Sequence, residues 1–322
     1  MDQNQMMDQN QLSRRDFLKM GASLAAFMGL SAVYHEGLAE ALEEMSTGRH
    51  RLLWLHGQAC TGCSVSFLNS VAPGPATILT QVVSLAFHST ISAAQGNVAM
   101  DAILKNIQNP GYILVFEGAV PMGMPRASLL NDRPMEETLL PAIQNAKLVI
   151  AIGTCATFGG MPGAEGNPTG AVSLKKFMEE KRLSTDKLLA LPNCPCHPES
   201  LVGSLVYYLK FGMPPKDSQY HRPTMFYSQS IHAECPRYHY YQNSIFASKF
   251  GDEHGCLFKL GCLGPLSYAN CARRQWNSGI NWCIRANAVC VSCSSEHFCT
   301  YKDLPFYRKG EANRSRQRRK VE

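Results

Sequence analysis

The segment from Cys256 to Cys299 holds seven of the thirteen cysteines in this 322-residue chain. Glycine, proline and asparagine fill much of the space between them, and the segment shows little of the apolar periodicity that builds a helix or a strand. Burial of apolar side chains is therefore not enough to fold it. The two kinds of bond that take over this task in proteins are disulfides and metal–thiolate bonds.

The spacing of the cysteines favours metal binding over disulfides. Cys290 and Cys293 form a C-x-x-C pair, which places two thiolates on one tight turn, facing one ion or cluster. Cys60 and Cys63 form a second such pair far upstream. The odd total of cysteines also argues against a closed set of disulfides. Zinc and iron–sulfur clusters both remain open from spacing alone.

The chain upstream of this segment alternates short apolar runs with helical patterns, and Gly57, Gly118 and Gly153 end three of the runs. Strands are predicted at residues 51–56, 112–117, 147–152 and 187–191. Helices are predicted at residues 64–71, 98–107, 135–144, 171–182 and 199–211. This alternation predicts an α/β fold, with a parallel sheet and helices on both of its faces.

Four cysteines follow directly after these strands: Cys60, Cys63, Cys155 and Cys194. In an open α/β sheet, ligands bind at the edge formed by the carboxyl ends of the strands. We therefore expect the four thiolates to converge on one site. The alternative is four unrelated buried cysteines, because free cysteine is often buried.

Pro214-Pro215 and Arg222-Pro223 mark a boundary, and beyond Met225 the pattern changes to short segments and loops. His232 opens this second part, three residues before Cys235. A lone histidine is usually a surface or hydrogen-bonded residue, but its place in a cysteine-rich region favours a role as a metal ligand.

The N-terminus reads as an export signal. Arg14 and Arg15 precede a short, weakly apolar run from Met20 to Val33, with small residues after it near Gly37. This order is typical of twin-arginine signals, which export proteins already folded and so suit a protein loaded with metal beforehand. An amphipathic N-terminal helix is the alternative. The apolar run is too short for a transmembrane helix, so we expect no transmembrane segment.

Net charge excludes an obvious nucleic-acid partner. The chain carries +6, of which residues 308–322 contribute +5, residues 1–48 contribute −4 and the remainder +5. The remainder is only mildly basic for its size, so no nucleic-acid binding is expected. We interpret the basic tail as a solvated terminus, with contact to nucleic acid or membrane as the alternative.

Taken together, these motifs resemble the small, electron-transferring subunit of the nickel–iron hydrogenases. The matching motifs are R-R-D-F-L-K at 14–19, G-Q-A-C-T-G-C-S at 57–64, G-T-C-A at 153–156, P-N-C-P at 192–195, I-H-A-E-C at 231–235, L-G-C-L-G-P at 260–265 and A-N-C-A at 269–272. The resemblance implies a flavodoxin-like domain at 49–220 and a loop-rich iron–sulfur domain at 221–307. Residues 1–48 would be signal and leader, and residues 308–322 the tail.

The resemblance also implies three iron–sulfur clusters and their ligands. The proximal cluster would use Cys60, Cys63, Cys155 and Cys194, the distal cluster His232, Cys235, Cys256 and Cys262, and the medial cluster Cys271, Cys283, Cys290 and Cys293. Many family members have proline at the position of Cys283 and a three-iron medial cluster. With Cys283 as a ligand, all three clusters would be 4Fe-4S; without it the medial cluster would be 3Fe-4S. Cys196 and Cys299 are left as non-ligands.

Other positions resemble the nickel–iron–selenium subgroup, among them Ala59 in place of a glutamate and the sequence Asn281-Trp282-Cys283. The implied function is to relay electrons from the H₂ site of a partner large subunit, through the three clusters, to an external acceptor. No catalytic residue is expected in this chain itself. By family analogy the acceptor is a periplasmic cytochrome c, and the location is the periplasm.

Three other classes of protein compete with this interpretation. A standalone ferredoxin-like carrier would leave the α/β domain unexplained. A zinc-stabilised structural protein would be colourless, whereas iron–sulfur clusters make a protein brown. The related quinone-reductase subunit shares the α/β domain, but we expect it to lack the cysteines of the second domain.

Overall fold

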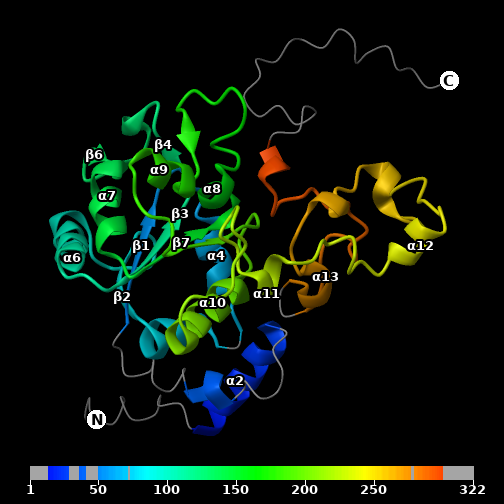
Figure 1. Cartoon of the computed structure of the whole chain (residues 1–322), viewed down its shortest axis with the longest axis horizontal. Coiled ribbons are helices and arrows are strands. Elements are labelled where there is room, and N and C mark those ends of the chain that lie inside the picture. The colour runs from blue at the N-terminus through cyan, green and yellow to red at the C-terminus, as the bar shows by residue number, and fades with distance from the viewer. Residues whose placement is uncertain (1–13, 29–35, 41–49, 72, 277–278, 300–322) are drawn as a thin grey trace.

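The computed structural model describes residues 14–28, 36–40, 50–71, 73–276 and 279–299. The predicted basic tail at 308–322 and most of the leader outside α2 (Arg14–Met28) lie outside the described residues. Figure 1 shows an α/β body, with a loop-rich lobe beside it that begins near α11 (Thr224–Tyr227).

Five parallel strands form the central sheet, in the order β2-β1-β3-β7-β9. The strands are β1 (Arg51–His56), β2 (Ser84–His88), β3 (Ile113–Glu117), β7 (Leu148–Ile152) and β9 (Leu188–Leu191). This is the flavodoxin-like order, which confirms the predicted α/β class. The four predicted strands are present, and β2 is an edge strand that the sequence analysis missed.

Helices cover both faces of the sheet, as predicted. They are α4 (Gly62–Leu68), α6 (Gly96–Gln108), α7 (Met135–Asn145), α8 (Gly153–Phe158), α9 (Leu174–Glu180) and α10 (Pro198–Phe211). Side chains of β1 alternate between the two layers: Leu53 and Leu55 pack with α6 and α7, whereas Leu52 and Trp54 pack with α4 and α10. Because β3 and β7 are buried on both faces, they appear in the sequence as continuous apolar runs.

One predicted helix, at residues 171–182, begins later than expected. Ala171 and Val172 form β8, which pairs antiparallel with β4 (Val120–Pro121). Ser173 then caps α9, because its side-chain oxygen accepts the backbone N–H of Lys176 at 3.2 Å. The remaining short elements of the body are α5 (Pro75–Thr77), η2 (Ile78–Val82), η3 (Pro125–Ala127), β5 (Leu129–Leu130) and β6 (Arg133–Pro134).

The second lobe is built from loops and single turns, as predicted. After α11 come α12 (Tyr238–Gln242), η4 (Leu257–Leu260), η5 (Gly264–Leu266), α13 (Cys271–Arg274) and η6 (Glu296–Cys299). Its buried side chains, such as Ile231, Leu257 and Trp282, belong to the same apolar cluster as α4 and α10. The lobe therefore packs on one side of the sheet and shares its core.

The N-terminal helix α2 lies against the body below α10 (Figure 1). Phe17, Ala25 and Met28 are buried in this contact, and the Arg274 guanidinium donates to the carbonyl of Ala26 at 2.9 Å. Within the described residues, no helix has the length and apolar character needed to cross a membrane.

Candidate metal centres

The four cysteines that follow the strands meet at the carboxyl edge of the sheet. Cys60 and Cys63 come after β1, Cys155 lies in α8 after β7, and Cys194 comes after β9. All four border one small cavity of about 70 Å³. The predicted convergence of these thiols is therefore present in the structure.

Glycine makes this close approach possible. A Cβ on Gly153 would collide with the sulfur of Cys63, and Gly153 has φ +81°, where other residues are strained. A Cβ on Gly160 would lie 2.7 Å from the sulfur of Cys155. The space next to two of the four sulfurs therefore exists only because side chains are missing there.

Burial disfavours the thiolate form, and so raises the pKa, of three cysteines around the cavity. Burial, followed by nearby Cys196 and Glu117, raises the pKa of Cys63 well above its ordinary value. Burial raises the pKa of Cys155 to about 11 and that of Cys194 to about 12. A buried thiol of this kind ionises when a cation replaces its proton, so this donor set fits a metal centre.

Glu117, at the end of β3, anchors the loop that carries the first C-x-x-C pair. Its carboxylate accepts the backbone N–H groups of Cys63 and Ser64 at 3.0 and 3.2 Å, and the Ser64 hydroxyl at 2.6 Å. It also lies 3.2 Å from the His56 ring. Burial pushes the pKa of Glu117 up, but the hydrogen bonds from His56 and Ser64 outweigh this effect and the pKa is lowered. In the sequence, Glu117 stands out only as the last residue of a predicted strand.

A second set of predicted ligands lies in the loop-rich lobe: His232, Cys235, Cys256 and Cys262. The backbone N–H of His232 donates to the carbonyl oxygen of Gly264 at 3.2 Å, and a Cβ on Gly264 would lie 3.5 Å from the sulfur of Cys262. Cys256 and Cys262 both raise the pKa of the Cys235 thiol, after the larger effect of burial, to about 11. The structure therefore brings the four residues together.

The imidazole of His232 offers a direct test of fit to a metal. Its Nε2 atom is buried and has no hydrogen-bond partner among the described residues. Such an atom costs free energy unless something binds it. Burial also lowers the pKa of His232, which favours the neutral ring that binds metal. The ring is held edge-on against Tyr238 and Tyr241.

The third set lies between the other two. The pKa of Cys271 is raised by burial and then by Cys293, Cys290 and Cys283. The Asn193 amide works in the opposite direction, because it lies 3.8 Å from the sulfur of Cys271 and 3.8 Å from that of Cys293. Cys283 is exposed, unlike the other members of the set. It contributes to the raised pKa of Cys271, whereas burial and then Cys262 of the distal set raise the pKa of Cys283 itself. Trp282 beside it is buried.

Cys196 and Cys299, predicted as non-ligands, are buried next to the proximal set. The Cys196 N–H donates to the sulfur of Cys63 at 3.4 Å, and Cys194 raises the pKa of Cys299, after burial. Neither borders the 70 Å³ cavity. All thirteen cysteines lie in the described part of the chain, and none of them forms a disulfide.

In the described ranges, no three His, Cys, Asp or Glu side chains are close enough to hold a single metal ion. The ligands of an iron–sulfur cluster lie farther apart than those of a single ion, because each thiolate binds a different iron. The four cysteines that border the 70 Å³ cavity match that requirement.

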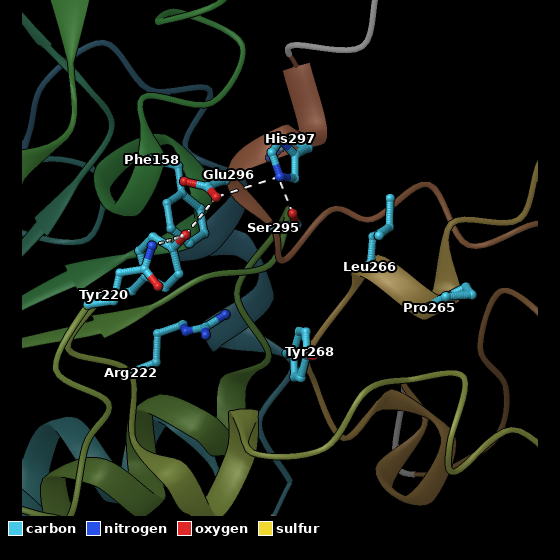
Figure 2. A pocket seen from close by; sticks show the side chains of 10 residues that line it. Phe158, Tyr220, Arg222, Pro265, Leu266, Tyr268, Ser295, Glu296 and His297 are labelled. Atoms are coloured by element: carbon cyan, nitrogen blue, oxygen red, sulfur yellow. Dashed lines mark hydrogen bonds and ion pairs between the residues drawn. The ribbon is translucent and has the colours of Figure 1, made fainter.

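A larger cavity, of about 370 Å³, lies between the two lobes (Figure 2). Tyr220 donates its hydroxyl to Glu296 at 2.6 Å across this cavity, and the Arg222 guanidinium stacks over the ring of Tyr220. None of the predicted ligands lines it. No local motif in the sequence predicts this cavity, because its walls come from segments far apart in the chain.

Comparison with known proteins decides the family. Residues 227–307 match the family of the C-terminal part of NiFe/NiFeSe hydrogenase small subunits, and residues 60–208 match NADH ubiquinone oxidoreductase, 20 Kd subunit. The periplasmic NiFeSe hydrogenase small subunit of Desulfomicrobium baculatum is 37% identical over 316 residues, which cover 92% of this chain and 98% of the relative. The chain belongs to the NiFe/NiFeSe hydrogenase small subunits.

Other relatives agree with this assignment. The periplasmic NiFe hydrogenase small subunit 1 of Nitratidesulfovibrio vulgaris is 38% identical over 307 residues, covering 92% of this chain and 93% of the relative. A structure of a reduced, active form of the NiFeSe hydrogenase from D. baculatum superposes with a TM-score of 0.74 at 37% identity, covering 80% of this chain and 98% of that one.

The predicted family and function are thus confirmed: this hydrogenase small subunit is the electron-transfer subunit, and a large subunit is its partner. Members of the family bind iron–sulfur clusters. The match to the quinone-reductase subunit is confined to the first lobe, as expected for a shared α/β domain. A standalone carrier and a zinc-stabilised structural protein are both set aside.

Proposed function

We propose that this small subunit holds three 4Fe-4S clusters and uses them to relay electrons from the H₂ site of its large subunit to an external acceptor. The proposed ligands are Cys60, Cys63, Cys155 and Cys194 for the proximal cluster, Cys271, Cys283, Cys290 and Cys293 for the medial cluster, and His232, Cys235, Cys256 and Cys262 for the distal cluster. The observation that carries the proposal is the single cavity bordered by four thiols that reach it from three different strand ends. When bound, such clusters accept and release one electron at a time.

Contacts between the sets support a relay in the order proximal, medial, distal. Burial raises the pKa of Cys194, and Cys293 of the medial set contributes to the rise. Burial likewise raises the pKa of Cys290, and Cys262 of the distal set contributes. The medial set therefore lies next to both of the others.

The charge of the ligands differs along this order. Eleven of the proposed ligands are thiolates, and His232 is neutral. A neutral ligand leaves less negative charge on the distal cluster, which raises its potential. His232 thus favours electron flow toward the distal end.

The surface beside the proximal set supports the large subunit as the partner that covers it. Cys60 is exposed, and the adjacent helix α4 presents Val65 and Leu68 to solvent, each about half exposed. Val71 continues this apolar surface. Obligate interfaces are large and apolar, and this one would exclude water from the proximal ligands.

At the opposite end, exposed aromatic and apolar side chains lie close to the distal set. The ring centroid of Tyr241 lies 4.5 Å from that of His232 and 5.6 Å from that of Phe258. Ile245 and Phe250 expose large apolar surfaces nearby in the chain. We propose this rim as the surface on which a periplasmic cytochrome c docks.

Export, subgroup and domain limits complete the proposal. Relatives in D. baculatum and N. vulgaris are named periplasmic, which supports export to the periplasm by the twin-arginine pathway. We assign the chain to the selenium subgroup, with domains at 49–220 and 221–307.

The export route is tested at the arginine pair. Arg14→Lys combined with Arg15→Lys should trap the precursor in the cytoplasm, whereas Lys19→Gln should not. Normal periplasmic levels of the double variant would disprove the export route.

The ligand proposal is tested with a pair of cysteines that lie side by side. Cys194→Ser, in the anaerobically purified heterodimer, should lose about one cluster of iron and sulfide, since one proximal ligand is gone. Cys299→Ser, next to it but outside the cavity, should lose none. Equal iron content in the two variants would contradict the proposal.

A further inference from the structure

Asn193 lies in the loop that leaves β9, directly before Cys194, and only 2% of it is exposed. Its backbone N–H donates to the Thr154 hydroxyl at 3.0 Å, and its carbonyl accepts the Thr154 N–H at 3.1 Å. The same hydroxyl donates to the carbonyl of Cys293. Asn193 is therefore fixed at the junction of the proximal loops and the segment that carries Cys293.

The side chain of Asn193 faces two sulfurs at once. Its amide nitrogen lies 3.8 Å from the sulfur of Cys271 and 3.8 Å from that of Cys293. An amide carries two N–H groups, so it can donate to both. The backbone of Asn193 has φ +119°, in the region where glycine is least strained. An asparagine at such a position indicates that its contacts offset the strain.

We propose that Asn193 is a positioning residue that raises the reduction potential of the medial cluster. The inference rests on the proposed function, because it needs a cluster bound to Cys271 and Cys293. An N–H group that points at a thiolate sulfur stabilises negative charge there, and reduction adds negative charge to the cluster. Asn193 therefore favours the reduced medial cluster, and it does so from the residue next to a proximal ligand.

Two substitutions separate this role from a structural one. Asn193→Gly removes both donors and suits the positive φ, so it should preserve the fold. Asn193→Asp keeps the shape but places one oxygen acceptor where the amide nitrogen carried both donors. In the intact heterodimer, a potentiometric titration followed by electron paramagnetic resonance should show a more negative medial potential in the glycine variant. At alkaline pH, the medial reduction potential of the aspartate variant should be more negative still. The reduction potentials of the proximal and distal clusters should not change.

Asn287→Gly is the matched control. Asn287 also has a positive φ, +57°, in the same lobe, but its amide bonds the carbonyl of Asp252 at 3.3 Å and accepts from Arg237. Its removal should leave the medial potential unchanged.

The outcomes separate the inference from the function on which it rests. An unchanged medial potential in both Asn193 variants, with every wild-type cluster present, overturns the inference and leaves the proposed function standing. Loss of the medial cluster from both variants also overturns it, because Asn193 would then serve assembly. A wild-type heterodimer without a medial cluster contradicts the proposed function, and the inference with it.

Discussion

The backbone N–H of Leu263 donates to the carbonyl oxygen of Cys290 at 2.7 Å. Leu263 directly follows Cys262, a proposed distal ligand, and Cys290 is a proposed medial ligand. On the other side of the medial set, Asn193 joins Cys271 and Cys293 to the loop of Cys194. Each proposed centre is therefore tied to the next by a hydrogen bond.

Replacing Cys283 by proline should convert the medial cluster to a three-iron form. Cys271, Cys290 and Cys293 can bind three irons, and proline offers no ligand for a fourth. The oxidised Cys283→Pro heterodimer should show the paramagnetic resonance signal of a three-iron cluster. Cys196→Ser, which removes a buried thiol outside the proposed set, should show none. If Cys283→Pro keeps the wild-type spectrum, Cys283 is not a ligand.

His232→Ala should slow the exit of electrons more than the activation of hydrogen. The distal set lies at the far end of the proposed relay, so hydrogen–deuterium exchange at the large subunit should persist. Reduction of a dye or cytochrome should fall by roughly tenfold or more. His254→Ala is the control, because His254 is an exposed ring that bonds Tyr240 nearby. An equal loss of both activities in correctly folded His232→Ala would disprove the distal assignment.

Gly153→Ala should lose the proximal cluster. Its methyl group would collide with the sulfur of Cys63 at a position with positive φ, at a cost of more than about 2 kcal/mol. Gly212 has nearly the same φ, +80°, but nothing within 4 Å of an added Cβ. Gly212 combines this φ with ψ −159°, a region that other residues rarely adopt, so Gly212→Ala should cost about 1–3 kcal/mol of backbone strain but retain all its iron. Iron content and thermal unfolding temperature measure both effects, and full iron in Gly153→Ala would refute the prediction.

Acid should destabilise the first lobe through His88. Burial lowers the pKa of His88 to about 4, and the nearby His56 adds to the shift. Its Nδ1 accepts the backbone N–H of Thr90 at 3.0 Å, which requires the neutral ring. As pH falls from about 6.5 toward 4, His88 binds a proton in the unfolded chain but not in the folded chain. The free energy of unfolding therefore decreases across that window. One pKa unit is worth about 1.4 kcal/mol, so the loss amounts to about 3 kcal/mol.

The check compares thermal unfolding temperatures of the heterodimer across that pH range. His88→Asn, which retains an acceptor for Thr90, should show a shallower dependence on pH than wild type, even though it is less stable at neutral pH. His254→Asn should keep the wild-type slope. Parallel curves for wild type and His88→Asn would show that His88 does not control acid stability.

The sequence predicted those features that depend on local pattern. Strands β3 and β7 are continuous apolar runs, and parallel strands end at one edge, so the meeting of Cys60, Cys155 and Cys194 could be expected before the structure was known. Strand β2 was missed because η2 precedes it directly, and residues 78–88 form one largely apolar stretch without a turn signal.

Roles that depend on distant partners could not be predicted. Glu117 lies 54 residues from Cys63, whose N–H it accepts, and Asn193 lies 78 and 100 residues from the two sulfurs that it faces. Glu117 belongs to no local motif, and the P-N-C-P motif that contains Asn193 does not indicate which sulfurs its side chain faces. The folding of the α/β body brings Glu117 to Cys63, and the packing of the two lobes brings Asn193 to Cys271 and Cys293.

The central claim is that this chain holds three four-iron clusters, and Mössbauer spectroscopy of the anaerobically purified, ⁵⁷Fe-labelled heterodimer tests it most directly. We expect the iron of the small subunit to appear as three 4Fe-4S clusters, one of them with a distinct iron site bound to His232. Fewer than three clusters, or a three-iron cluster in the freshly prepared wild-type protein, would contradict the account.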